Sequence, residues 1–119
     1  MSATTITMQR RAADDLSAVA ETLYRELDRS AEIICFTSRG AADSQAILIS
    51  GEKFFFRNGS YASLSVMLTE FDGVQTADIV GSGGGEGLFN ISLFANSDFA
   101  DKARQILQSC GFSAAEEND

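Results

Sequence analysis

The clearest periodic pattern near the start of the chain is that of a helix. Between residues 14 and 29, large apolar residues recur every three or four positions, the spacing that places side chains on one helix face. These residues are Leu16, Val19, Leu23 and Leu27. Asp14 is suited to cap the start of the helix. We therefore predict a helix with one buried face over this segment.

The residues that follow have the pattern of β-strands. Runs rich in apolar, β-branched and aromatic residues alternate with short turn signals made of Gly, Asn and Asp. The predicted strands cover residues 32–39, 45–50, 53–57, 61–71, 74–80 and 88–94. Gly51-Glu52, Asn58-Gly59 and Asp72-Gly73 are predicted to be tight hairpin turns, with a two-residue loop at Asn58-Gly59. Residues 4–8 also favour a strand, and we expect residues 1–10 to form a first strand or a loose arm.

Residues 61–71 allow two interpretations. Leu64, Val66 and Leu68 alternate with small polar residues, as expected for a strand with one buried and one wetter face. In the competing interpretation, Leu64 and Leu68 share a helix face with the aromatic residues at both ends of the segment. We favour the strand, because the alternation continues between two turn signals.

Helical spacing returns near the C-terminus. The apolar stripe of this second helix consists of Phe99, Ala103, Ile106, Leu107 and Cys110. Asn96 or Ser97 is predicted to cap its start, and Gly111 to end it in the left-handed conformation. Residues 113–119 are small or acidic, and we expect them to form a disordered tail.

This order of elements predicts an α+β fold with two layers. Consecutive strands joined by tight turns pair antiparallel, and two helices that each have one apolar face can cover the same side of a sheet. We expect an antiparallel sheet of about five or six strands with an N-terminal and a C-terminal helix on one face, a helix-grip-like arrangement. At 119 residues the chain is expected to form a single domain, residues 1–119.

Several of the predicted strands are apolar on both faces. Phe54, Phe55 and Phe56 are consecutive, so in a strand their side chains point to both sides of the sheet. Ile34 and Phe36 lie in a similarly apolar strand. Two helices cover only one face, and the other would expose more apolar surface than monomers usually do. A homodimer, a curved sheet around a small apolar ligand, or a strongly twisted sheet would each bury it. We favour a homodimer with these five residues at the interface.

Composition and charge narrow the possible partners. The chain is 45% apolar and 22% charged, values typical of globular proteins. A net charge of −8 repels phosphate backbones and anionic membranes, so we expect neither nucleic-acid nor membrane binding. No run approaches the roughly 20 apolar residues of a membrane helix. The first residues lack a signal-peptide pattern, and we expect a cytoplasmic protein.

The residue inventory also restricts the chemistry. The chain has no histidine, which excludes a Ser-His-Asp triad, a Cys-His pair and histidine-ligated metal centres. Cys35 and Cys110 lie in different predicted elements without a ligand spacing, and we expect separate thiols. We assign no catalytic residue, no metal and no cofactor.

A glycine-rich run is the most conspicuous local motif. It consists of Gly81, Ser82, Gly83, Gly84, Gly85, Glu86 and Gly87. The run lacks a P-loop lysine and leads into a predicted strand instead of a helix, so a phosphate site is disfavoured. We interpret it as a hairpin connection, or as the border of a site for an uncharged ligand. The carboxylates Glu70, Asp72, Asp78 and Glu86 offer acid-base chemistry only if the fold brings them together.

The C-terminal half carries a resemblance to other proteins. The segment TADIVGSGGGEGLFNIS, with the preceding SLSVML strand and the following helix, resembles small uncharacterised bacterial domains of unknown function. This resemblance implies no activity and transfers no functional residue.

The function therefore stays open at the level of sequence, with three hypotheses from different classes. The leading hypothesis is a non-catalytic, cytoplasmic interaction module that forms a homodimer through its sheet. The second is a carrier or sensor of a small apolar ligand held between sheet and helices. The third is an enzyme that uses carboxylates at the glycine-rich run.

Overall fold

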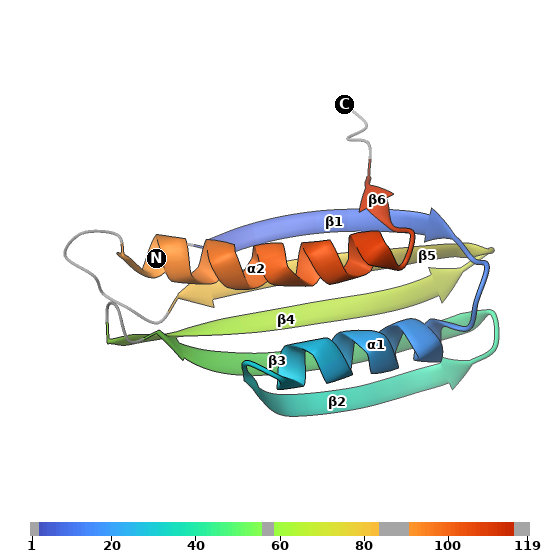
Figure 1. Cartoon of the computed structure of the whole chain (residues 1–119). Coiled ribbons are helices and arrows are strands. Elements are labelled where there is room, and N and C mark those ends of the chain that lie inside the picture. The colour runs from blue at the N-terminus through green and yellow to red at the C-terminus, as the bar shows by residue number, and fades with distance from the viewer. Residues whose placement is uncertain (1–2, 56–58, 84–90, 116–119) are drawn as a thin grey trace.

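The protein has two layers, a six-stranded sheet and a pair of helices. The structure, a computed structural model, describes residues 3–55, 59–83 and 91–115. Both helices lie on the same side of the sheet (Figure 1). The predicted two-layer α+β architecture is confirmed.

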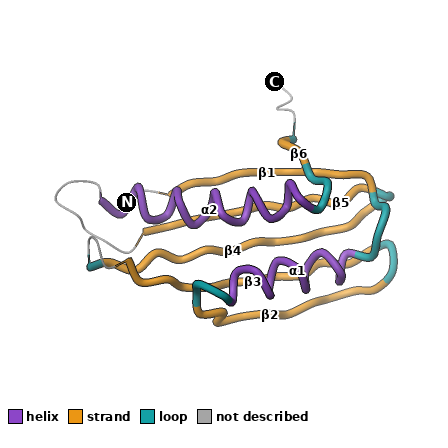
Figure 2. The backbone as a smooth tube through the Cα atoms, viewed as in Figure 1, coloured by secondary structure: helices purple, strands orange, loops and turns teal. Residues whose placement is uncertain are grey.

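The sheet is antiparallel throughout. Its strands are β1 (Ala3–Arg11), β2 (Glu32–Ala41), β3 (Ser44–Phe55), β4 (Ser60–Phe71), β5 (Val74–Gly83) and β6 (Ser113–Ala114). They lie in the order β2-β3-β4-β5-β1-β6 (Figure 2), so β4 is the middle one of the five long strands. The N-terminal segment is a strand that pairs with β5 along its whole length. Residues 61–71 are confirmed as a strand.

Strand β3 corrects one predicted turn. Gly51-Glu52 does not reverse the chain, because β3 runs unbroken from Ser44 to Phe55. Gly51 pairs with Ile33 of β2, and a Cβ at this position would lie 3.2 Å from the carbonyl oxygen of Glu32. This glycine therefore serves a close approach of two strands, a role that sequence alone does not distinguish from a turn.

The turn at Asp72-Gly73 has the predicted form. Phe71 pairs with Val74, and the two residues between them have φ angles of 53° and 76°. Two consecutive positive φ angles are the mark of the two-residue hairpin turn that Asp-Gly favours. The predicted turn at Asn58-Gly59 lies partly outside the described residues, where only Gly59, with φ of 63°, can be placed.

The helices are α1 (Leu16–Asp28) and α2 (Ile91–Ser109). The N-cap of α1 is Asp15, not Asp14, since the Ser17 backbone N–H donates to the Asp15 carboxylate at 3.2 Å. Residues 91–94, predicted to end a strand, already belong to α2, so the helix starts before the expected caps at Asn96 and Ser97. An apolar run of this length does not by itself separate a strand from a buried helix.

The core fills the space between the sheet and the helices. α1 packs on β2, β3 and β4, whereas α2 packs on β1, β4 and β5. The apolar stripe of α1 is buried as predicted, and that of α2 is buried except for the half-buried Cys110. The residues they meet include Met8, Ile47, Ile49, Leu64, Val66, Leu68, Ala77 and Ile79.

The C-terminal segment is attached to the sheet further than expected. Gly111 has φ of 98° and ends α2, with the Phe112 N–H donating to Leu107 at 3.0 Å, as in a Schellman motif. Residues 113–114 then form β6 beside β1, although we expected the tail to be disordered from residue 113. Residues 116–119 lie outside the described part of the chain.

Candidate functional site

The side of the sheet that faces away from the helices is the candidate functional surface, and we call it the open face. No described element covers it (Figure 1). Six large apolar side chains on this side are between 38% and 59% exposed. They are Leu48, Phe54, Tyr61, Met67, Phe71 and Val80. They alternate along β3, β4 and β5 with the buried residues of the core, so they share one side of the sheet.

Small hydroxyl side chains fill much of the rest of the open face. Ser50 and Ser65 are joined by a hydrogen bond of 2.8 Å, and Ser63 and Ser82 by one of 2.6 Å. These pairs link β3 to β4 and β4 to β5. Because the hydroxyls satisfy one another, a partner surface can cover them without leaving buried polar atoms unpaired.

Most charged residues of the open face lie towards its two ends. Glu32 pairs with Glu52 at one end of β2 and β3, and Arg39 lies near the other end of β2. Arg11 ends β1, while Asp78 lies centrally on β5 and accepts a hydrogen bond of 2.9 Å from Thr7. The described strand residues of this face therefore include two positive and three negative side chains. The open face is nearly neutral in a chain of net charge −8.

The five residues predicted for a dimer interface are not all on the open face. Phe54 lies there, with its ring 5.0 Å from that of Tyr61. Phe36 points to the helix side, where its ring lies 5.2 Å from Tyr24 of α1. The exposed Ile34 lies at the register shift of β2, between Ile33 and Cys35, which both pair with β3. Phe55 belongs to β3, but its side chain, like all of Phe56, lies outside the described structure.

The glycine-rich run is described only in part. Gly81, Ser82 and Gly83 are the last residues of β5, whereas Gly84, Gly85, Glu86 and Gly87 lie outside the described residues.

The carboxylates predicted near this run are separated by the fold. Glu70 and Asp72 lie at the opposite end of β5 from Gly83, and Asp78 lies between the two ends. The described residues contain no group of three acidic or thiol side chains that could hold a metal ion.

A buried polar network, which the sequence did not predict, crosses three strands on the helix side. Gln75 is fully buried, and its amide donates to Glu70 at 2.7 Å and to the carbonyl of Asp14 at 2.8 Å. Its oxygen accepts from Nε of Arg10 at 2.6 Å. The Arg10 guanidinium also donates to the carbonyl of Cys110. The network therefore ties the entry of α1 and the exit of α2 to the sheet.

The Arg10 guanidinium is only partly satisfied by this network. Its carbon lies 5.1 Å above the Phe112 ring, a cation–π arrangement. Its Nη2 is buried, and the described residues provide no acceptor for it. The apolar ring and the Gln75 amide together hold the charge against the end of α2.

An open cavity of about 520 Å³ lies where this network reaches the surface. It is lined by the segment before α1, the β2–β3 hairpin and the carboxylate of Glu70. Hydrogen bonds from Ser17, and a further one from Gln45 at 3.3 Å, lower the pKa of Asp15 at its rim. The lining is polar and lies at the end of the sheet away from Gly83, so it does not match the expected apolar ligand beside the glycine-rich run.

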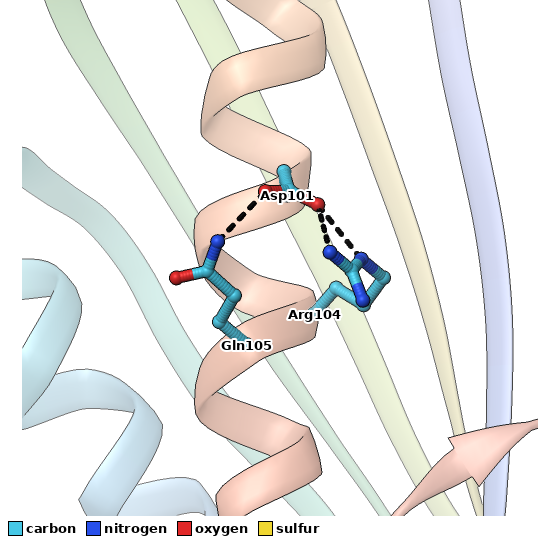
Figure 3. Close-up of polar contacts among 3 residues, drawn as sticks. All are labelled: Asp101, Arg104 and Gln105. Atoms are coloured by element: carbon cyan, nitrogen blue, oxygen red, sulfur yellow. Dashed lines mark hydrogen bonds and ion pairs between the residues drawn. The ribbon is translucent and has the colours of Figure 1, made fainter.

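The outward surface of the helices is of a different kind. Asp101 of α2 accepts hydrogen bonds from Arg104 and Gln105, three and four residues further along the same helix (Figure 3). Exposed pairs of this kind contribute about 0.3–0.5 kcal/mol to a helix. They are typical of a surface that stays in water, in contrast to the open face.

Comparisons with known proteins identify the family and no function. The family of unknown function DUF6054 matches residues 1–111, so the chain belongs to this family. The match confirms the resemblance to uncharacterised domains and extends it beyond the C-terminal half. No curated protein and no solved structure matches the chain. None of the described helices is long and apolar enough to cross a membrane.

Proposed function

We propose that this member of the family is a non-catalytic, cytoplasmic interaction module that forms a homodimer by packing its open face on that of a second copy. The observation that carries the proposal is the set of six large apolar side chains on one uncovered side of the sheet, each at least 38% exposed. Apolar patches of this kind on otherwise polar proteins mark interaction sites.

The size of the open face suits a dimer. Five strands spaced by about 4.8 Å, each with about ten residues of 3.4 Å, give a surface of about 24 by 34 Å. This corresponds to about 800 Å² per partner, the usual contribution of each protein to a stable interface. Sheets also pack face to face at a spacing of about 10 Å, with side chains from both inner faces forming a core.

The polar groups of the open face support a second copy as the partner. A near-neutral face avoids the repulsion that two chains of net charge −8 would otherwise experience at contact. The hydrogen-bonded serine pairs can be covered without loss of their partners. Cytoplasmic location is supported by two free cysteines in separate elements, which suit a reducing compartment.

Met67→Glu tests the proposed dimer at the centre of the face. Met67 is 44% exposed and points away from the core, so the charge is tolerated in a monomer but not inside a sheet-on-sheet interface. We expect sedimentation equilibrium to give twice 12.7 kDa for the native chain and a single-chain mass for the variant.

A matched control adds the same charge to the other layer. Gln108→Glu changes an exposed residue of α2 and should leave the dimer intact. The proposal fails if the native chain sediments as a monomer, or if Met67→Glu remains a dimer while circular dichroism shows both variants to be folded.

A further inference from the structure

The open face also carries the information that orients such a dimer, an inference that rests on the proposed function. Two aligned sheets related by a two-fold axis leave two choices for that axis in the plane of the interface. With the axis along the strands, β2 of one copy lies over β1 of the other. With the axis across the strands, β2 lies over β2 and the two copies run in opposite directions.

The register defines where the centre of the face lies. Paired residues of neighbouring strands form rows that run across the sheet. One of the two middle rows contains Leu48, Met67 and Asp78, and the other contains Ser50, Ser65 and Val80. The next row outward on one side contains Arg39, and the next on the other side contains Glu32 and Glu52. Arg39 and Glu32 are therefore placed symmetrically about the middle of β2.

Charge distinguishes the two axes. With the axis across the strands, Arg39 of each copy lies over Glu32 of the other, which forms the same ion pair twice. With the axis along the strands, Arg39 comes over the row of the partner's β1 that contains Gln9, and Arg11 lies in the next row outward. The first arrangement joins opposite charges, whereas in the second the charge nearest to Arg39 on the partner's β1 is a like one.

The aromatic residues are compatible with the same choice. Tyr61 and Phe71 lie near the two ends of β4, five residues on either side of Val66. An axis that crosses the middle of β4 puts Tyr61 of one copy on Phe71 of the other. The contact occurs twice in the dimer, so the Tyr61 and Phe71 rings of both copies are covered. We propose that the dimer is antiparallel, with its two-fold axis across the strands and Arg39–Glu32 ion pairs at its rim.

A charge exchange tests the orientation. Arg39→Glu and Glu32→Arg should each raise the dimer dissociation constant by about tenfold at low ionic strength, because each faces a like charge in the partner. The double variant Arg39→Glu/Glu32→Arg should restore native affinity. Among the described residues, Arg39 bonds only to the neighbouring Thr37 and Ser38, so the monomer tolerates its loss.

The controls separate the orientation from the dimer itself. Arg25→Glu makes the same charge change on exposed α1 and should leave the dissociation constant unchanged. An affinity that rises with Arg39→Glu, as the removal of Arg39–Arg11 repulsion predicts, would overturn the antiparallel arrangement. So would a double variant as weak as either single one. The loss of the dimer in Met67→Glu would still support the open face in both cases, whereas a native monomer would refute both proposals.

Discussion

Gln75 is the residue on which the connections between helices and sheet converge. It is the only fully buried polar side chain among the described residues, and its amide uses the oxygen and both hydrogens. It also lies between Glu70 and Arg10, so it bridges a buried carboxylate and a partly buried guanidinium. Such a bridge stabilises because each charge would otherwise lose a hydrogen bond in a buried setting.

Replacing Gln75 by Leu should therefore destabilise the protein more than its size suggests. The variant keeps the side-chain volume but removes the hydrogen bonds that Gln75 makes with Glu70, the Asp14 carbonyl and Nε of Arg10. We expect the free energy of unfolding to fall by about 2–4 kcal/mol in urea titrations. Gln108→Leu, the same substitution at an exposed position of α2, is the control and should change it by less than about 0.5 kcal/mol. A Gln75→Leu variant as stable as this control would show that the network contributes little.

Sequence predicted the neighbours of this network but not the network itself. The alternation of β4 correctly assigned Leu64, Val66 and Leu68 to the buried face, and the same alternation leaves Met67 on the open face. Glu70 and Gln75 also occupy inward positions, but their meeting depends on the strand register that the Asp72-Gly73 turn sets. A polar residue at an inward position was the available signal, and it becomes specific only once its partner is known.

At the scale of elements, glycines with similar positive φ angles serve different purposes. Gly40 and Gly73 have φ angles of 80° and 76°. A Cβ at Gly40 would lie 2.2 Å from the carbonyl oxygen of Ser44, whereas a Cβ at Gly73 would meet no atom within 4 Å. The β2–β3 hairpin thus requires glycine for space as well as for backbone conformation, and the β4–β5 turn requires it for conformation alone.

The pair Gly40→Ala and Gly73→Ala measures that difference. Gly73→Ala should reduce the free energy of unfolding by about 1 kcal/mol, the cost of a positive φ for an L-residue. Gly40→Ala adds a clash with backbone and should cost about 2 kcal/mol or more. Urea denaturation of both variants provides the comparison. Equal losses would mean that the hairpin relaxes freely around the added methyl group.

The elements that sequence assigned incorrectly are those whose local signal has two physical meanings. Gly51 was predicted to turn the chain, but it allows β2 to approach β3 closely. Residues 88–94 were predicted as a strand, yet residues 91–94 are helical. The register shift in β2 separates Ile33 from Cys35, so Phe36 lies beside Tyr24 on the helix side and not on the open face. A strand bulge of this kind has no reliable sequence signal.

At the scale of the whole molecule, the two faces of the protein differ in the environment that they suit. The helix layer presents charged side chains to water, as at Asp101 and Arg104. The open face instead combines exposed apolar residues with hydroxyls that hydrogen-bond to one another, and its net charge is close to zero. An acidic chain that leaves one face neutral and apolar has a surface suited to burial, and a second copy has the matching area and charge.

Native mass spectrometry of the gently purified chain tests this account most directly, because one spectrum reports both assembly and any retained small molecule. We predict a species of twice 12.7 kDa without additional mass. A single chain of 12.7 kDa across the accessible concentrations would contradict the homodimer and mean that the open face stays in water. A single chain with extra mass that disappears on denaturation would also contradict it, and would identify the protein as a carrier of that molecule.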